Sequence, residues 1–149
     1  MLIVDQLSKL LIANNLYIGE SVPREGLFRI TYVMNSGSAF SVFTGSPIFF
    51  VFASVVAISV LLVFYSSQSI GGPWLKISLG LQMGGAIGNL IDRIRLGAVI
   101  DFIDVGWWPV FNLADSSIVI GLCILAFILL TNRITNERNR QEVDEDLVQ

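Results

Sequence analysis

The sequence has 149 residues, of which 54% are hydrophobic and 14% are charged, and its formal net charge is −3. Because a typical soluble domain carries about 25% charged residues, this composition excludes an ordinary soluble globule and favours a small polytopic membrane protein. The chain contains no histidine and one cysteine, Cys123, which excludes imidazole-based catalysis and an intrachain disulfide. It has no basic patch with interleaved aromatic residues, so nucleic acid is not an expected partner.

The first helix and the long connection after it are predicted within residues 1–46. Residues 1–16 are largely apolar with Asp5 and Lys9 embedded, but as a helix they reach only about 24 Å. We therefore expect the outer part of a transmembrane helix whose beginning is missing. In the connection, apolar residues alternate with others over residues 28–34. This alternation predicts a small extramembrane β element between the first and second helices.

Three further apolar segments complete the predicted fold, at residues 47–65, 74–91 and 110–130. The first of them carries no charge and as a helix spans about 28 Å, close to the thickness of a bilayer core. The predicted fold class is an all-α membrane protein with four transmembrane helices and the small β element. We expect residues 1–132 to form one membrane-embedded domain and residues 133–149 to form a polar, acidic, partly disordered tail.

Polar and charged residues interrupt these apolar segments at a few points. An ionisable residue within a membrane span costs about 2.5–3.5 kcal/mol on insertion scales, so each one needs a reason. If the four spans alternate in direction, all of these points fall near the same membrane face. The positions are Asp5 with Lys9, Asn35 with Gly37, Asn89 with Asp92 and Arg93, Asn112 with Asp115, and Asp101.

Some of these residues have simple structural interpretations. Asp5 and Lys9 are four residues apart and can neutralise each other on one helix face, and Asp92 with Arg93 can anchor a helix end at headgroup depth. Glycines at every fourth position, Gly80, Gly84 and Gly88, favour close helix packing.

Asp101 and Asp115 have no such structural interpretation, because neither has a basic residue within one helical turn of sequence. Two carboxyl groups without histidine or a metal-binding cluster suggest aspartic chemistry, in which one holds a proton and the other acts as a base toward water. The sequence alone does not show that the two meet in space.

The polar positions also carry a resemblance to a known family. Up to Leu130 the chain resembles lipoprotein signal peptidase, also called signal peptidase II. The matching segments are VDQLSK at residues 4–9, NSGSAF at 35–40, GGAIGNLIDR at 84–93, VIDF at 99–102 and FNLAD at 111–115. Any one of them is a weak signal, but all five in this order at suitable intervals are highly specific.

The family consists of four-helix inner-membrane aspartyl proteases that cut prolipoproteins just before the diacylglyceryl-modified cysteine. The resemblance implies that Asp101 and Asp115 form the catalytic dyad, without assigning which is acid and which is base. The matched positions that bind substrate or support the site are Asp5, Lys9, Asn35, Gly37, Asn89, Asp92, Arg93 and Asn112. Two features depart from the family pattern: the short start of the chain, and Ser38 at a position that is often alanine.

The resemblance also implies a location and partners. The basic residues are divided evenly between the two sides, so the positive-inside rule leaves the orientation open. The family places the polar clusters and a β-cradle at the outer leaflet, with the acidic tail inside. We accordingly expect a multi-pass protein of the bacterial cytoplasmic membrane that binds prolipoproteins and membrane lipids, acts as a monomer and needs no metal or organic cofactor.

Two other classes of protein remain open on the residues alone. Carboxylates within membrane spans also carry ions or protons, so a small transport or proton-relay protein is the main alternative. Four short helices offer little room for alternating access, and the chain has no inverted repeat. A non-catalytic helix-packing subunit is the third possibility, which the glycines favour and the aspartates do not.

Overall fold

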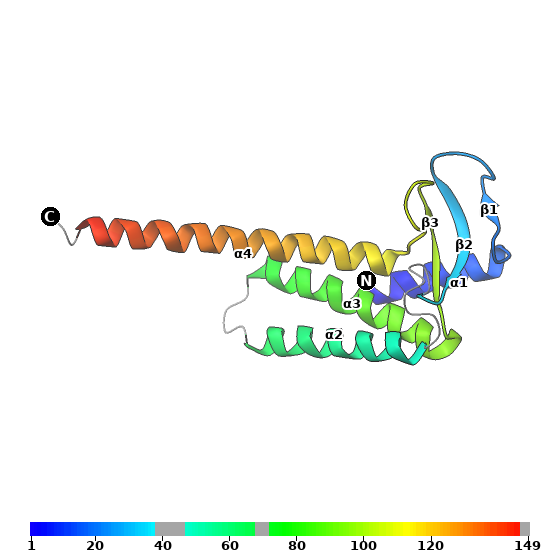
Figure 1. The fold of residues 1–149 in the computed structure, drawn as a ribbon, viewed down its shortest axis with the longest axis horizontal. Helices are drawn as coiled ribbons and strands as arrows, with labels where there is room; N and C mark the ends of the chain where they lie inside the picture. The colour runs from blue at the N-terminus through cyan, green and yellow to red at the C-terminus, as the bar shows by residue number, and fades with distance from the viewer. Residues whose placement is uncertain (38–46, 68–71, 147–149) are drawn as a thin grey trace.

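The computed structural model describes the backbone of residues 1–37, 47–67 and 72–146, and the side chains of these residues except 47 and 133–146. Ser38 and the rest of the segment 38–46 lie outside the described residues. Four helices and three strands make up the described chain (Figure 1). The helices are α1 (Leu2–Asn15), α2 (Pro47–Ser67), α3 (Pro73–Leu96) and α4 (Leu113–Asp146), and the strands are β1 (Ser21–Val22), β2 (Arg29–Asn35) and β3 (Val99–Asp104).

Helix α3 is the centre of the helical part, because it packs against each of the other three helices. The helices α2, α3 and α4 lie side by side, and the strands stand at the end where α4 begins (Figure 1). Helix α1 runs in the same direction as α3, since Met1 lies beside Gly84 and Asp5 lies one turn later beside Gly88. The end of α3 and the start of α4 therefore meet at the same end of the molecule.

The glycines of α3 explain how closely these helices approach. A side chain at Gly88 would collide with the Asp5 carboxylate, and one at Gly84 would press on Met1. Gly80 has open space instead, so the predicted packing role is wrong for that position. Gly85, which the four-residue spacing does not include, lies directly against the backbone of α4 at Ala114.

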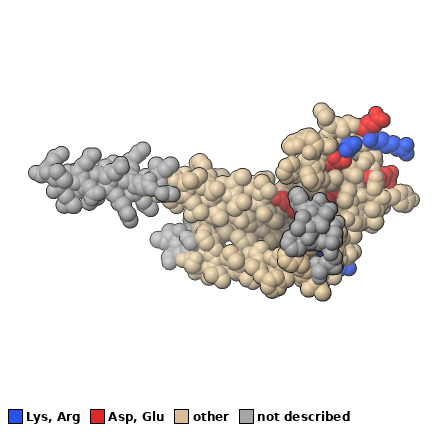
Figure 2. Space-filling view, in the orientation of Figure 1, with Lys and Arg blue, Asp and Glu red and all other residues tan. Residues whose placement is uncertain are grey.

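The burial pattern of the described residues is inverted relative to a soluble protein, in which charged groups face solvent. Large apolar side chains such as Ile48, Phe52 and Val60 of α2 are exposed, and the visible charged side chains gather at the sheet end (Figure 2). The buried polar side chains are those of Asp5, Lys9, Ser78, Gln82, Asn89, Asp92, Asp101, Asp104, Asn112 and Ser117. An apolar exterior around a polar interior suits a lipid environment.

Two of the helices are long and apolar enough by themselves to cross a membrane, over Ile48–Ser67 and Leu113–Asn132. Helix α1 has 14 residues, and α3 has a lower mean hydropathy than α2 and carries many of the buried polar groups. The predicted helices thus exist. Length and composition support a membrane span for α2 and α4, and a span for α1 and α3 stays a prediction.

The sheet differs from the prediction in its make-up. Its strand order is β1-β2-β3, with antiparallel pairing throughout. We expected the β element only between the first two helices, but the third strand lies between α3 and α4 and contains Asp101. This strand escaped the sequence analysis because it is buried on both faces, so it lacks the alternation that marks a half-buried strand.

The helix boundaries also correct two expectations. Helix α3 continues to Leu96, beyond the predicted end at residue 91, and ends at Gly97, whose φ of +73° suits glycine; Arg93 lies in its last turn. The prediction of a partly disordered tail is wrong for its backbone up to residue 146, because α4 continues as a helix to Asp146.

Candidate active site

The carboxylate of Asp101 lies at the centre of the polar cluster, on strand β3, with 1% of its surface exposed. Each of its oxygens accepts a hydrogen bond from an asparagine amide. Asn112 Nδ2 donates to Oδ1 over 2.6 Å, and Asn35 Nδ2 donates to Oδ2 over 2.8 Å. Burial is the main cause that raises the pKa of Asp101 to about 6, although the two amide hydrogen bonds oppose it.

Asp115 is fixed by the way in which α4 begins. Asn112 precedes the first turn, and its Oδ1 accepts from the backbone N–H of Asp115 over 2.9 Å. The Asp115 carboxylate reaches back through Oδ2 to the backbone N–H of Asn112 over 3.3 Å. This reciprocal arrangement is a capping box, which satisfies two N–H groups that a helix start leaves free. The local sequence Asn-Leu-Ala-Asp therefore sets the position of this carboxylate.

Two asparagines connect the two aspartates. Asn89 on α3 donates from Nδ2 to Oδ1 of Asp115 over 2.7 Å, and its Oδ1 accepts from Asn112 Nδ2 over 3.1 Å. The Asn112 amide also donates to Asp101, so a continuous path of hydrogen bonds runs from one carboxylate to the other. The structure thus brings Asp101 and Asp115 into one site, which the sequence alone could not show.

Lys9 holds this arrangement from α1. Its ammonium group, on a side chain that is only 2% exposed, lies 2.9 Å from Asp5 Oδ2, 2.8 Å from Asp92 Oδ2 and 2.9 Å from Asn89 Oδ1. An ammonium has three donors, and all three have acceptors here. Because a buried charge is costly unless it is paired and hydrogen-bonded, these contacts explain how a lysine is tolerated between packed helices.

The two acidic partners of Lys9 extend the network to the other elements. Asp5 Oδ1 accepts from the backbone N–H of Ala114 in the first turn of α4 over 3.0 Å. Asp92 Oδ2 accepts from the backbone N–H of Ile100 on β3 over 3.2 Å. Each aspartate therefore ties a helix to the element that carries one of the two central carboxylates.

The sequence analysis missed Gln6, which joins the same two aspartates. Its Nε2 lies 3.2 Å from Asp5 Oδ2, 3.1 Å from Asp92 Oδ1 and 3.2 Å from the carbonyl oxygen of Gly88. Its place between Asp5 and Lys9 in the sequence was the only available signal.

Gly37 and Arg93 lie at the edge of the cluster. The backbone N–H of Gly37, at a φ of +84°, donates to Asn35 Oδ1 over 2.8 Å, so it fixes the amide that binds Asp101. Arg93 instead reaches α2, where its Nη1 donates to Ser54 Oγ over 3.1 Å and its guanidinium lies over the ring of Phe50. The sequence analysis assigned no site residue to α2, because this helix carries no charge.

No group of three or more metal-ligating side chains occurs within the described part of the chain. Carboxyl groups with amide donors around them, as in this cluster, are able to carry out acid–base chemistry.

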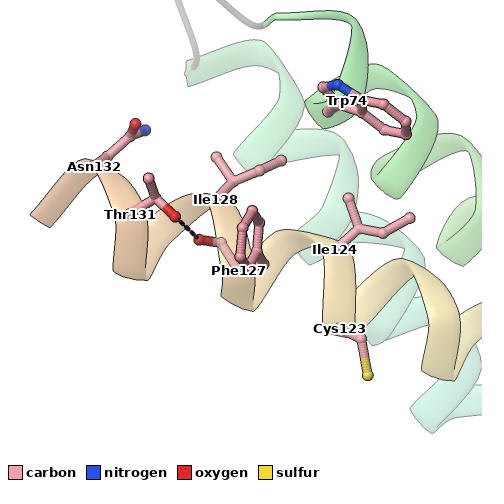
Figure 3. Close-up of a pocket in the computed structure, with 7 residues that line it drawn as sticks. All are labelled: Trp74, Cys123, Ile124, Phe127, Ile128, Thr131 and Asn132. Atoms are coloured by element: carbon pink, nitrogen blue, oxygen red, sulfur yellow. Dashed lines mark hydrogen bonds between the residues drawn. The ribbon is translucent and has the colours of Figure 1, made fainter. Parts of the chain in front are cut away.

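A cavity of about 520 Å³ lies at the opposite end of the bundle, where α3 begins (Figure 3). Trp74, Ile124, Phe127 and Ile128 line it, and Thr131 and Asn132 supply its few polar atoms. It contains none of the predicted site residues, so the polar cluster, rather than this cavity, is the candidate active site.

Comparison with known proteins gives a match over most of the sequence, because the family model described as signal peptidase (SPase) II matches residues 1–131. The chain belongs to the signal peptidase II family. The lipoprotein signal peptidase of Halothermothrix orenii is 45% identical over 130 residues, covering 87% of this chain and 89% of the relative. That of Moorella thermoacetica is 46% identical over 131 residues, covering 87% of both chains.

Solved structures show the same fold for this signal peptidase II chain. One, a bacterial membrane enzyme determined at 2.3 Å by the in meso method, matches with a TM-score of 0.79 and 32% identity, over 89% of this chain and 84% of the other. A second bacterial membrane enzyme, determined at 1.9 Å by the same method, matches with a TM-score of 0.78 and 33% identity, over 87% and 86%. Family membership favours a membrane protease over the transport alternative.

Proposed function

We propose that this membrane protease, which removes signal peptides from prolipoproteins, works as an aspartic endopeptidase with Asp101 and Asp115 as its catalytic groups. It cuts just before the cysteine that carries a diacylglyceryl group. One observation carries the proposal: two carboxylates from different elements, β3 and α4, are joined through the amides of Asn112 and Asn89. The family explains which peptide is cut, and this geometry supplies the groups that can cut it.

The reaction needs one proton shared between the two carboxyl groups. Ionising both of two close carboxyl groups is costly, because the like charges repel each other. Burial raises the pKa of Asp101 to about 6, which favours its protonated form below that pH. The protonated group polarises the scissile carbonyl while the ionised group takes a proton from water. The water oxygen bonds to the carbonyl carbon. The C–N bond then breaks as the leaving nitrogen receives a proton, without a covalent enzyme intermediate.

The surrounding groups keep this pair in place. Lys9 and Asp92 link α1 to α3, and Asp5 holds the start of α4. Fixed hydrogen-bond donors reduce the reorganisation needed when charge develops in the transition state. The asparagine amides around Asp101 and Asp115 serve this purpose in our proposal, and Arg93 offers further donors beside them.

We further propose that all four helices lie in the bacterial cytoplasmic membrane, with the cluster toward the outer leaflet. Ile3, Leu7 and Leu11 on the outer face of α1 are 73%, 55% and 64% exposed, whereas the Asp5 and Lys9 side chains face α3 and are covered. Helix α1 therefore presents an apolar surface outward and a polar one inward, which supports its placement in lipid.

Cleavage of a diacylglyceryl-modified prolipoprotein by the purified protein in lipid tests the proposal, with Asp115→Asn measured beside the parent. Ser116→Ala is the matched control, because Ser116 follows Asp115 and its hydroxyl donates to the backbone carbonyl of Asn112 rather than to a carboxylate. We expect the parent and Ser116→Ala to cut the lipidated substrate before its cysteine, and Asp115→Asn to lose about two orders of magnitude or more in rate. Near-normal turnover by Asp115→Asn would reject the assignment.

A further inference from the structure

Helix α2 has no charged residue over Pro47–Ser67 and most of its surface is exposed, yet two of its side chains contact the active site. Both contacts are with Arg93, which lies on α3 one residue after Asp92. Ser54 and Phe50 are four residues apart and so share one face of α2. This face points toward α3, against which α2 packs.

The hydroxyl of Ser54 is fixed as an acceptor. It donates its own hydrogen to the carbonyl oxygen of Phe50 over 2.8 Å, in the preceding turn of α2. A serine hydroxyl has one hydrogen and two lone pairs, so the oxygen is left to receive the N–H of Arg93 Nη1 at 3.1 Å. The guanidinium can only donate, and the bond to Phe50 engages the serine hydrogen, so the Ser54 oxygen is oriented to accept from Arg93.

The ring of Phe50 is held from two sides. The guanidinium carbon of Arg93 lies 5.8 Å from the ring centroid, within the range of a cation–π contact. On another side the ring fills the space that a side chain at Gly37 would occupy. Gly37 fixes Asn35, which binds Asp101. Phe50 is thus placed between Arg93 and the segment that positions one of the catalytic carboxylates.

Arg93 experiences the charges of three carboxylates without pairing with any of them. These are Asp115 on α4, Asp101 on β3 and Asp92 on its own helix. Lys9 on α1 also acts on Asp101 through its charge. The described carboxylates form ion pairs with Lys9 and Arg29, but none is within ion-pair distance of Arg93. A guanidinium in such a field favours bidentate pairing with a carboxylate, so a restraint is needed to keep it apart.

We propose that Ser54 and Phe50 are positioning residues that restrain the Arg93 guanidinium beside the two aspartates and prevent it from pairing with them. The inference rests on the proposed aspartic mechanism. A guanidinium paired with Asp101 or Asp115 would favour the fully ionised dyad, and the shared proton would be lost. A restrained one keeps its remaining N–H donors available for a carbonyl oxygen of the prolipoprotein peptide. Helix α2 therefore contributes to catalysis although it supplies no group that touches the reacting atoms.

The pH dependence of kcat for prolipoprotein cleavage tests this role, with Ser54→Ala as the main variant. Released Arg93 would pair with the dyad and lower the pKa of Asp101, so we expect kcat to fall about tenfold and the alkaline limb of the profile to move down by about half a pH unit or more. Ser54→Thr keeps the hydroxyl and should restore both values. Phe50→Leu removes the cation–π contact and should act in the same direction with a smaller shift.

Matched controls come from the same helix. Ser59 also donates to a carbonyl of its own helix, at Val55, but is exposed, and Phe52 is 65% exposed. Ser59→Ala and Phe52→Leu should match the parent in kcat and in pH profile. If they match the parent, a change on the surface of α2 is not enough by itself to shift the alkaline limb of the pH profile.

The outcomes separate this inference from the proposed function. A parent that cleaves and an Asp101→Asn variant that does not, together with a Ser54→Ala profile identical to that of Ser59→Ala, would overturn the restraint alone. Lower activity in Ser54→Ala without a shifted limb would also overturn it, because a purely structural defect has that signature. Normal cleavage by Asp101→Asn would overturn the proposed function and the inference with it.

Discussion

Strand β3 carries two aspartates that both have little exposed surface and whose pKa values shift in opposite directions. Asp101 is 1% exposed and Asp104 is 5% exposed. Asp104 binds the hydroxyl of Thr31 and the guanidinium of Arg29, each at 2.8 Å, and these partners lower its pKa, with the Thr31 hydrogen bond as the first cause. Asp101 has only amide partners, and burial raises its pKa to about 6.

The difference shows that a small exposed fraction alone does not decide whether a carboxyl group is charged or protonated. An adjacent cation and a hydroxyl fix Asp104 in its charged form, in which it joins β2 to β3. Asp101 lacks a direct cation and faces the like charge of Asp115, so its charged form is less favoured and it can hold a proton near neutral pH. The chemistry of the partners separates a structural aspartate from one that can catalyse.

The largest expected contrast is between two cations, Lys9 in the active-site cluster and Arg29 beside Asp104. Lys9→Met leaves Asp5 and Asp92 buried without their cation, and we expect it to destabilise the protein by about 3–5 kcal/mol. Arg29 is 28% exposed in its pair with Asp104, so Arg29→Met should cost about 1 kcal/mol or less. Denaturation of both variants in the same detergent measures the difference. Equal losses would show that the buried ammonium of Lys9 contributes no more to stability than the partly exposed guanidinium of Arg29.

The neutral donors on β2 sharpen the comparison at the level of activity. Asn35 donates to Asp101 and Thr31 donates to Asp104. Asn35→Ala removes a hydrogen bond to a catalytic carboxylate, so we expect kcat to fall about tenfold or more. Thr31→Val acts on the structural aspartate and should leave kcat within about twofold, although it lowers stability. An equal effect of the two changes on kcat would contradict the distinction between Asp101 as catalytic and Asp104 as structural.

The pH dependence of cleavage separates the two carboxyl groups further. Burial raises the pKa of Asp101 to about 6. Raising the pH through this value should therefore remove the shared proton and lower kcat. The alkaline limb is expected near pH 6 in the parent and at the same place in Asp104→Asn. An alkaline limb that moves in Asp104→Asn would mean that the shared proton has been assigned to the wrong aspartate.

The smallest expected effect concerns acid stability. A lowered pKa in the folded state means that Asp104 contributes stability above its unfolded pKa of about 3.9 and loses this contribution as the pH falls through its folded value. The melting temperature of the parent should therefore drop modestly below about pH 4, and that of Asp104→Asn should drop less. A steeper drop in Asp104→Asn would reverse the sign of the argument.

Part of this structure follows from the sequence because the relevant signals are local. The charge-free run from Pro47 predicts α2, and the alternation at residues 28–34 predicts β2. Four spans that alternate in direction predict that the polar clusters gather at one end, and the structure brings them together there. The sequence analysis did not predict the capping box between Asn112 and Asp115, although their spacing of three residues is the one that such a box uses.

Other parts depend on contacts between distant segments. Strand β3 is buried on both faces, so its apolar run has no strand-like period. Gln6 and Ser54 are ordinary helix residues until Asp92 and Arg93 come within hydrogen-bond distance of them, 86 and 39 residues away in the sequence. The role of such a residue is set by its partner rather than by its neighbours in the chain.

The most direct test is the cleavage rate of a diacylglyceryl-modified prolipoprotein by Asp101→Asn and Asp104→Asn, measured side by side with the parent in lipid. The two substitutions are chemically identical, lie three residues apart on one strand and affect aspartates of similar burial. We predict a loss of about a hundredfold or more for Asp101→Asn and a loss of no more than about threefold for Asp104→Asn. Similar rates in the two variants would contradict the assignment of Asp101 as a catalytic residue.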